Sequence, residues 1–278
     1  MNSPINTLRL VVRKTRAIAQ SAFLAHPKQV ECNVCGWQGR HFLGDAWHER
    51  INCPRCRSGV RQRLFFAALE HLSDHSIGKL FSGKRVLHFA PEPAVATRIQ
   101  SWSDQYHSAD FMREDCDLRL DMCNLAGISD ASYDVVVAFD VLEHVPDTVK
   151  ALDEVRRVLS TRGVGIFTVP QQDGLSTTYE DPSILTAAGR ESHFGQHDHL
   201  RIFGLDFAQV VACRGFSVAA VDETDFSTKV QLKNVLFPPK MSLHPLATTI
   251  ERFTSAPRIR MCWGAHESLV ADCSSRKR

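Results

Sequence analysis

The chain has 278 residues, of which 44% are hydrophobic and 23% are charged, as in ordinary globular proteins that bury a sizeable core. The 33 basic and 31 acidic side chains leave a net charge of +2, which is too small by itself to indicate a nucleic-acid partner. No apolar run approaches the roughly 20 residues that cross a membrane. The first residues also lack the apolar region and cleavage site of a secretory signal.

Residues 1–27 contain four basic side chains and no acidic one. Their apolar residues recur at nearly helical spacing, which predicts a basic amphipathic helix. Such a helix either docks on the rest of the protein or makes peripheral contact with an anionic membrane surface. In a eukaryotic protein the same pattern would resemble a transit peptide.

Residues 28–60 contain two Cys-x-x-Cys pairs separated by 17 residues, Cys32 with Cys35 and Cys53 with Cys56. Each pair forms a tight turn that directs two thiolates to one point, and two such turns complete a tetrahedral site. We therefore expect a zinc ribbon with a structural Zn²⁺, because four protein ligands leave no open coordination position. The other five of the nine cysteines are scattered, which favours a reducing, cytoplasmic compartment over a disulfide framework.

A basic rim accompanies the cysteine pairs and has two interpretations. It is either the solvated surface of a small module or an electrostatic footprint for RNA. The arginines that form it are Arg40, Arg50, Arg55, Arg57, Arg61 and Arg63.

Residues 61–83 predict a helix that links the cysteine-rich segment to a larger domain, residues 84–278. Strands and helices alternate in this domain, which predicts an α/β fold, a parallel sheet with helices on both faces. The run "YDVVVAFDV" at 133–141 is almost wholly apolar, as in a strand that is covered on both faces. The expected strands are 85–89, 106–111, 117–122, 133–141 and 163–170, and the expected helices are 93–102 and 146–160, with Asp147 as the cap of the latter.

The pattern changes after residue 170. A polar segment at 171–201 is followed by an expected helix at 202–215 and an expected strand at 216–225. Residues 226–265 are poorly patterned, and "ESLVADC" at 267–273 is the candidate for a last strand beside the others.

Residues 85–225 resemble the class I S-adenosylmethionine-dependent methyltransferases of type 11. The motifs that carry the resemblance are "YDVVVAFDVLEHVPD" and "ALDEVRRVLSTRGVGIFTVP". The turn "HFAPE" and the later segments "TYEDPSI" and "FGQHDHLRIFGLDF" look like a subgroup that carries a zinc ribbon. The resemblance implies a Rossmann-like sheet of seven strands with helices on both faces, preceded by the zinc-ribbon module, and S-adenosylmethionine as the cofactor.

The cofactor loop departs from the family pattern V-L-D-x-G-x-G-x-G, because His88 replaces the acid and Ala90, Glu92 and Ala94 replace the glycines. A helix N-terminus binds the carboxylate of such a cofactor without strictly requiring glycine, and Glu92 suits its ammonium group. The resemblance assigns Asp110 to the ribose hydroxyls and Asp121 with Met122 to the adenine. The full expected cofactor set is His88, Ala90, Glu92, Asp110, Asp121, Met122 and Asp140.

The polar segment at 171–201 is the expected substrate segment. His199 beside Asp198 is the candidate general base, which would deprotonate a hydroxyl or amine before methyl transfer. Arg201 suits an anionic group of the substrate. A plain alternative is a lid whose polar residues satisfy one another. The expected substrate residues are His144, Tyr179, Glu180, His193, Gln196 and Arg201.

Three functions follow from this reading of the sequence. The first is a zinc-containing methyltransferase for a small-molecule or sugar-like acceptor. The second is an RNA methyltransferase that uses the basic zinc ribbon. The third is a non-catalytic binding protein on a methyltransferase fold that has lost its cofactor, as the missing glycines would allow. Neither the acceptor atom nor the oligomeric state follows from the sequence.

Overall fold

The computed structural model describes residues 29–44, 50–72, 76–172 and 174–236, together with the backbone of 259–266. The chain divides into two compact units. One unit comprises Met1–His71 with Glu223–Arg252, and the other comprises Leu72–Asp222 with Phe253–Arg278. The expected amphipathic segment at 1–27 and the expected strand at 267–273 lie outside the described residues. Among the described helices, none is long and apolar enough to cross a membrane.

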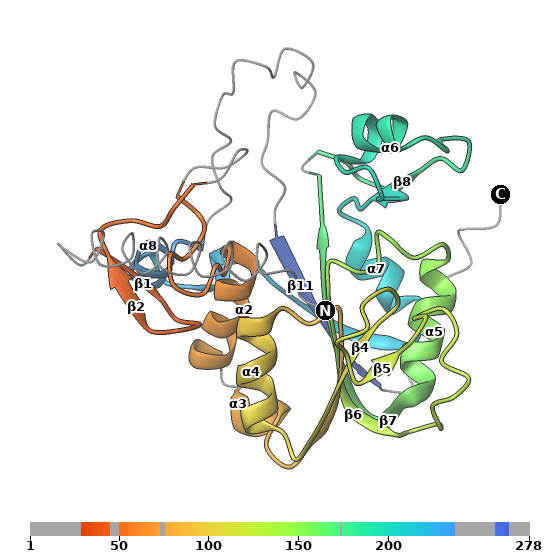
Figure 1. Ribbon diagram of the computed structural model, residues 1–278, viewed down its shortest axis with the longest axis horizontal. Helices are drawn as coiled ribbons and strands as arrows, with labels where there is room; N and C mark the ends of the chain where they lie inside the picture. The colour runs from red at the N-terminus through yellow and green to blue at the C-terminus, as the bar shows by residue number, and fades with distance from the viewer. Residues whose placement is uncertain (1–28, 45–49, 73–75, 173, 237–258, 267–278) are drawn as a thin grey trace, which may run out of the picture. The chain divides into compact units, whose positions relative to one another are not determined.

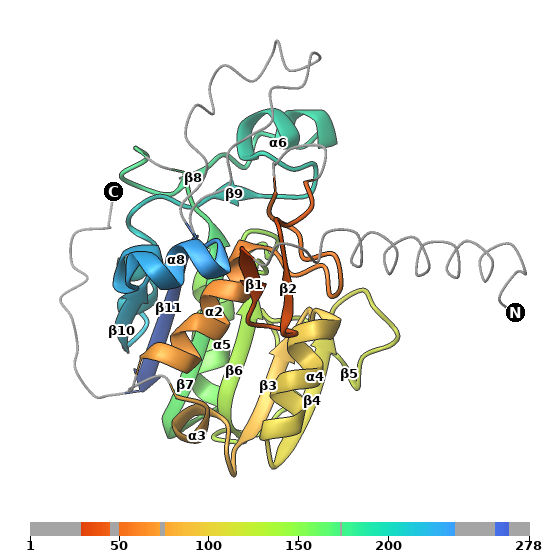
Figure 2. The ribbon, with the colours of Figure 1, turned by 90° about the vertical axis from the view of Figure 1, so that its left-hand side faces the viewer.

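The larger unit contains a seven-stranded sheet in the order β10-β11-β7-β6-β3-β4-β5, which Figure 1 shows from its edge and Figure 2 from its face. The pairs β3–β4, β3–β6, β4–β5 and β6–β7 are parallel, whereas β11 runs antiparallel to both β7 and β10. This confirms the expected α/β class. The strands are β3 (Arg85–Phe89), β4 (Gln105–Asp110), β5 (Leu118–Arg119), β6 (Tyr133–Phe139), β7 (Leu159–Pro170), β10 (Phe216–Val221) and β11 (Ile259–His266).

Helices cover both faces of this sheet. Helix α4 (Pro93–Trp102) lies on one side, and α5 (Thr148–Val158) and α7 (Phe207–Ala212) lie on the other (Figure 1). Asp147 caps α5 as expected, since its side chain accepts a hydrogen bond from the backbone N–H of Lys150. Strand β6 lies between β3 and β7 and is almost wholly buried, as its apolar sequence predicts. A short helix, α3 (Ile77–Leu80), precedes β3.

Three short elements follow β7 and lie over the carboxyl ends of the central strands (Figure 2). They are β8 (Tyr179–Glu180), α6 (Ala187–Phe194) and β9 (Arg201–Ile202), and β8 pairs with β9 antiparallel. Helix α6 begins at the cap residue Thr186 and ends at Gly195, whose φ of 85° suits glycine. The polar segment at 171–201 therefore has secondary structure of its own above the sheet.

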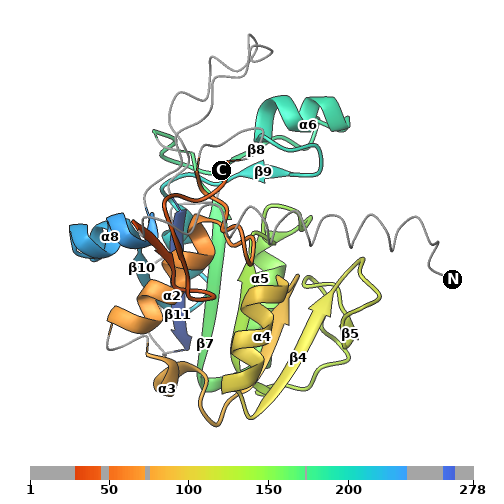
Figure 3. The same ribbon diagram turned by 60° about the vertical axis from the view of Figure 1, so that its left-hand side comes forward.

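The sheet edges differ from the sequence expectation in two places. The strand expected at 117–122 is only Leu118–Arg119, at the edge beyond β4 (Figure 3). Next to the other edge strand, β10, lies β11 (Ile259–His266), and all but its last residue falls in the stretch 226–265, whose pattern predicts no clear strand. Strand β11 pairs with β7 on one side and β10 on the other. Because these two neighbours set its register, its own sequence pattern need not be strong.

The smaller unit is built around the cysteine pairs. It contains β1 (Val30–Cys32), β2 (Trp37–Gly39), α2 (Val60–His71), the 3₁₀ turn η2 (Glu223–Asp225) and α8 (Thr228–Asn234). Asn234 donates its side-chain N–H to the Glu31 carbonyl at 2.9 Å, and Lys233 Nζ lies 3.1 Å from Glu31 Oε2. Helix α8 therefore packs on β1.

Candidate active site and metal centre

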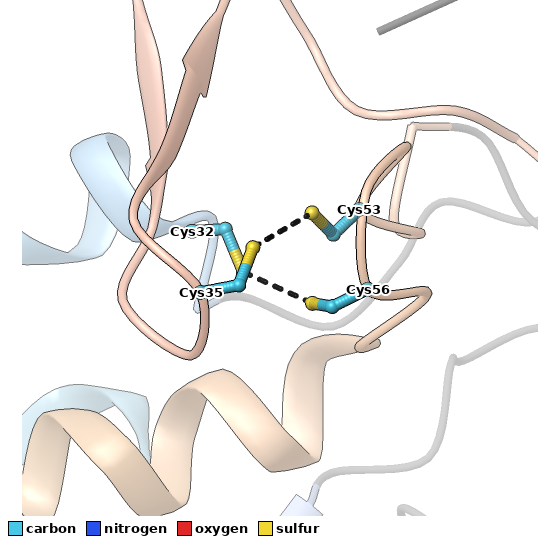
Figure 4. Close-up of side chains that lie close together, drawn as sticks. All are labelled: Cys32, Cys35, Cys53 and Cys56. Carbon is cyan, nitrogen blue, oxygen red and sulfur yellow. Dashed lines mark hydrogen bonds between the residues drawn. The ribbon is translucent and has the colours of Figure 1, made fainter. Parts of the chain in front are cut away.

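The four cysteines of the expected zinc ribbon lie together (Figure 4). Cys32 Sγ is 3.7 Å from Cys56 Sγ, and Cys35 Sγ is 3.7 Å from Cys53 Sγ. Four sulfurs about 2.3 Å from one Zn²⁺ would form a tetrahedron with edges of about 3.8 Å. The donor set and its spacing therefore fit a four-cysteine zinc site.

Arg63 on α2 holds the second cysteine turn against α8. Its guanidinium donates to the carbonyls of Ile51 and Ser58 at 2.7 and 2.8 Å and to those of Asn234 and Val235 at 2.7 and 3.2 Å. The side chain is fully buried. Arg63 therefore cannot belong to an exposed basic rim, which corrects one member of the RNA footprint considered from the sequence.

The turn after β3 keeps a conformation that usually requires glycine. Ala90 has a φ of 46°, in the left-handed region, and its N–H donates to the Ala109 carbonyl on β4 at 2.8 Å. Glu92 is the N-cap residue of α4 but its side chain does not cap that helix, and Pro93 occupies the first helical position. The loop has thus changed its residues without losing the turn from β3 into α4.

Three aspartates end the neighbouring strands. Asp110 ends β4, and its Oδ1 accepts the N–H groups of Met112 and Arg113 at 2.7 and 2.9 Å. Asp121 follows β5 and accepts the N–H of Cys123 at 2.8 Å. Asp140 follows β6 with a φ of 51° and accepts the hydroxyl of Thr168 at 2.8 Å.

Parallel strands direct their carboxyl ends to one edge of the sheet, so these acids and Glu92 line the edge where ligands of such folds bind. The sulfonium and ammonium groups of S-adenosylmethionine are cations, which an edge rich in carboxylates suits. A second feature also fits this cofactor, because the backbone turn at Ala90 survives the loss of glycine. The residues present therefore fit the cofactor that the family resemblance implies.

Two expected cofactor residues do not reach this edge. The His88 ring is fully buried, and its Nδ1 lies 3.0 Å from the Tyr106 hydroxyl. Burial lowers the pKa of His88 to about 3, so the ring is neutral. Met122 is 2% exposed and packs in the hydrophobic core beneath α5. Both residues belong to the core. The His88 ring on β3 contacts Tyr106 on β4, and Met122 lies in the turn after β5 with its side chain among the core residues.

A cluster of ionisable side chains lies where β6 meets the segment above the sheet. Glu143, His144 and His199 each offer a ligand atom within 4.8 Å of the others. The imidazole rings of His144 and His199 are perpendicular, with centroids 4.7 Å apart. His144 Nδ1 lies 3.4 Å from Asp198 Oδ2. The fold therefore brings His144, Asp198 and His199 together, as a joint site near the acceptor would require.

Glu143 is the member of this cluster that sequence reasoning missed. Its side chain is fully buried, although it follows the strand end in the motif "LEHV". Charged side chains are rarely buried without a functional or structural reason. The only sequence signal was a carboxylate directly before His144.

His199 has a defined tautomer. Its Nδ1 lies 3.2 Å from the backbone carbonyl of Phe194, which can only accept a hydrogen bond. Nδ1 therefore carries the proton, and Nε2 keeps its lone pair when the ring is neutral. Burial and the neighbouring His144 lower the pKa of His199, which favours that neutral form.

Arg201 and Glu180 form an internal ion pair instead of facing an open site. Arg201 is 2% exposed, and its guanidinium contacts both carboxylate oxygens of Glu180 at 2.8 and 3.1 Å. It also donates to the carbonyls of Leu142, Val145 and Pro146. The expectation that Arg201 binds an anionic substrate group is corrected, because its donors already have partners in the protein.

Of the remaining substrate candidates, His193 and Gln196 are exposed on the segment and Tyr179 is half-buried. The Tyr179 hydroxyl lies 3.0 Å from His193 Nδ1. Gln196 donates to Asp198 Oδ1 at 2.8 Å, which orients the carboxylate that contacts His144. These residues hydrogen-bond partly to one another, as the interpretation of the segment as a lid predicts. His144 and His199 remain as the central pair of the ionisable cluster.

Several solved structures are similar to this chain. A 1,6-didemethyltoxoflavin-N1-methyltransferase from Burkholderia thailandensis has 11% identity and a TM-score of 0.46, with 74% of this chain and 78% of that chain covered. A putative sarcosine dimethylglycine methyltransferase from Galdieria sulphuraria has 15% identity and a TM-score of 0.47, with 74% and 86% covered. Similarity at this level says nothing about the acceptor. No curated protein matches the sequence.

The model of a methyltransferase-domain family matches residues 76–167. The matched part runs from α3 through β3, β4, β5 and β6 into β7, which are the strands that carry the acidic edge. This stretch, 92 of the 278 residues, is therefore similar to the methyltransferase-domain family, in agreement with the S-adenosylmethionine-dependent methyltransferase domain that the resemblance implies.

Proposed function

We propose that this domain methylates a hydroxyl or amine of a small-molecule or sugar-like acceptor, bound over the carboxyl ends of β6 and β7. The observation that carries the proposal is the environment of His199. Its proton is fixed on Nδ1 by the Phe194 carbonyl, so Nε2 is left as a proton acceptor beside the acidic edge.

S-adenosylmethionine, when bound, supplies an electrophilic methyl group that passes to the acceptor as its carbon–sulfur bond breaks and S-adenosylhomocysteine leaves. Asp110 would accept hydrogen bonds from the ribose hydroxyls through Oδ2, because its Oδ1 accepts the N–H groups of Met112 and Arg113. Asp121 lies at the expected adenine end, and Glu92 lies at the turn that would receive the amino-acid end. Asp140 ends β6 beside the acceptor cluster.

When no metal ion is bound beside His199, its Nε2 accepts the proton of the acceptor. His144 and Asp198 lie beside it and orient the acceptor through hydrogen bonds, because the carboxylate of Asp198 contacts His144 from the solvent side. Burial of His199 keeps water from competing for Nε2, since this residue is only 7% exposed. Arg201 and Glu180 hold the segment in place over this site.

The four-cysteine site has a separate proposed role. We propose that it binds one Zn²⁺ that stabilises the smaller unit, because all four positions of a tetrahedral ion are taken by the protein. Arg63 and α8 pack around the cysteine turns and would keep the site closed. The RNA alternative keeps Arg40, Arg50, Arg55 and Arg57 as exposed cations, but it loses Arg63.

Calorimetric titration of the zinc-loaded full chain with S-adenosylmethionine and S-adenosylhomocysteine tests cofactor binding. We expect binding that Asp110→Asn weakens about tenfold or more, since charged hydrogen bonds to the ribose are lost. Glu114→Gln is the matched control, because Glu114 is an exposed acid four residues away. A folded protein that binds neither compound would overturn the enzymatic proposal and favour a non-catalytic binding protein.

The acceptor class is tested by methyl transfer to a panel of sugars, phenols and amines. His199→Asn should abolish transfer to the best acceptor without weakening cofactor binding, because His199 contacts the acceptor and not the cofactor. Salt-dependent binding of structured RNA, with transfer to RNA and to no small acceptor, would favour the RNA alternative.

A further inference from the structure

We propose that Glu143, His144 and His199 form a second metal site, which binds a divalent first-row transition-metal cation. One ligand atom from each residue lies within 4.8 Å of the others. Glu143 and His144 follow β6, and His199 precedes β9 in the segment above the sheet. The site is therefore formed by two parts of the chain that only the fold brings together.

The donor set defines the kind of cation. Two imidazoles and a carboxylate suit Mn²⁺, Fe²⁺, Co²⁺ and Zn²⁺, and three protein ligands leave coordination positions open. The four cysteines form the opposite kind of site, soft and closed. Two metal centres of different chemistry would then serve one chain, the first for stability and the second for binding a ligand.

The contacts around the histidines are those that orient metal ligands. His199 donates Nδ1–H to the Phe194 carbonyl, which leaves Nε2 for a cation. The Nδ1 of His144 faces Asp198, and Gln196 in turn donates to that carboxylate at 2.8 Å. Each imidazole thus has an acceptor on its Nδ1 side, as ligating histidines almost always do.

The backbone holds the two loops together without the cation. Leu200 N–H donates to the Glu143 carbonyl at 2.9 Å, and Arg201 donates to the carbonyls of Leu142 and Val145 on either side of the ligand pair. The ligands are therefore pre-positioned by bonds that do not involve their own side chains. Glu143 is fully buried and His199 nearly so, while the His144 side chain is 32% exposed. Access to the site is thus at His144.

The role of the cation rests on the proposed methyl transfer, although its binding does not. An acceptor hydroxyl bound at an open position would be oriented toward the cofactor edge, and its pKa would fall. His199 would then act as a ligand and not as the proton acceptor. The proton would leave to Asp198, which lies beside His144 and half exposed to solvent.

The site is tested directly by titrating the full chain, loaded with a single Zn²⁺ at its four cysteines, with Mn²⁺, and the electron paramagnetic resonance of the free aqua ion measures the Mn²⁺ that remains unbound. We expect one bound Mn²⁺ per chain. Glu143→Gln and His199→Asn should each weaken binding about ten- to hundredfold. His193→Asn is the matched control, an exposed histidine of the same segment that contacts Tyr179, and should leave Mn²⁺ binding unchanged.

A second measurement guards against variants that fail to fold. Co²⁺ added to the zinc-loaded wild-type chain should give visible bands of nitrogen and oxygen coordination without the intense thiolate charge-transfer band. The proposal is overturned if the wild-type chain binds neither Mn²⁺ nor Co²⁺ beyond its zinc, or if His199→Asn binds as tightly as wild type. Calorimetric titration with S-adenosylmethionine in the presence of a chelator distinguishes this result from a failure of the methyl-transfer proposal, because it measures cofactor binding without the second metal.

Discussion

Arg201 and Glu180 form a two-point ion pair across β8 and β9, with Nε–Oε2 at 2.8 Å and Nη2–Oε1 at 3.1 Å. The two residues face each other because β8 and β9 pair antiparallel with Glu180 opposite Arg201. The remaining donors of the guanidinium reach the carbonyls of the loop that carries Glu143 and His144. One buried arginine therefore fixes the segment above the sheet on the loop that follows β6.

Replacing Arg201 by lysine should destabilise this region strongly. A lysine cannot reproduce the planar fork of donors, so the loop carbonyls and Glu180 lose hydrogen bonds. Leaving buried acceptors without donors is costly. We expect the free energy of unfolding to fall by about 3 kcal/mol. Glu180→Gln should cost only about 1 kcal/mol, since the Glu180 side chain is 47% exposed. Urea denaturation measures both values.

The matched control is Arg162→Lys, because Arg162 is an exposed arginine of β7. We expect it to change the free energy of unfolding by less than about 0.5 kcal/mol. Equal losses in the Arg201 and Arg162 variants would show that the contacts of Arg201 do not hold the segment.

The altered cofactor loop gives a second prediction, at Ala90. Its φ of 46° is a conformation that a β-branched residue adopts only under strain. Ala90→Val should therefore lower the free energy of unfolding by about 1–2 kcal/mol. Ala90→Gly should stay within about 0.5 kcal/mol of wild type, because relief of strain in the folded state offsets the greater freedom of the unfolded chain.

Ala94→Gly is the contrasting control, because Ala94 lies in the first turn of α4 and has no such φ. Glycine there should cost about 1 kcal/mol, as in other helices. A larger cost at position 90 than at position 94 would contradict the requirement for a left-handed turn at Ala90.

Local patterns made much of the fold and the cysteine site predictable. The spacing of Cys32, Cys35, Cys53 and Cys56 is itself the geometry of two tight turns, and the apolar run of β6 reports burial on both faces. Asp147 marks the start of α5, and the N–H that its side chain accepts belongs to Lys150, three residues later. In each case the residues that interact are near one another in the chain.

The remaining features depend on residues far apart in the sequence. Arg201 looks like an anion-binding residue until its burial against the loop after β6 is known. His88 occupies a cofactor position in the motif, but the pleat directs its ring to Tyr106 in the core. Glu143 gains its meaning only when the fold places His199 beside it. The sequence pattern does not show which way a strand side chain points where a motif is altered. It also does not show which distant loops come into contact.

His88 gives a third prediction, a pH dependence of stability. Its pKa is about 3 in the folded protein and close to 6.5 when unfolded, so only the unfolded state gains a proton between these values. This contribution to stability is therefore fully present above pH 6.5 and is lost as the pH falls toward 3. Relative to His88→Gln, wild type should lose up to about 1.4 kcal/mol per pH unit below 6.5.

Denaturation by urea at pH 7.0, 6.0 and 5.0 measures this difference, with both proteins in the same buffers. The comparison cancels every other titrating group, because wild type and His88→Gln share them. A stability difference that stays constant across this pH range would show that the buried ring is protonated as easily as an exposed one.

The last prediction joins Arg63 to the cysteine site. Arg63 donates to the carbonyls of Ile51 and Ser58, which flank the second cysteine pair, and to those of Asn234 and Val235 at the end of α8. Arg63→Lys keeps the charge but loses this fork, so we expect the smaller unit to be destabilised by about 2–3 kcal/mol. Because zinc binding and folding of this unit are coupled, the variant should also release Zn²⁺ faster to a chelator.

Zinc release to a chromogenic chelator and the zinc content of the purified chain measure this effect. Arg40→Lys is the matched control, since Arg40 is an exposed arginine close to β2, and it should release zinc at the wild-type rate. Cys53→Ser sets the other limit, because three remaining thiolates cannot complete the tetrahedron. If Arg63→Lys retains zinc as wild type does while Cys53→Ser loses it, then α8 and the cysteine turns are held together by their apolar packing and not by the buried guanidinium.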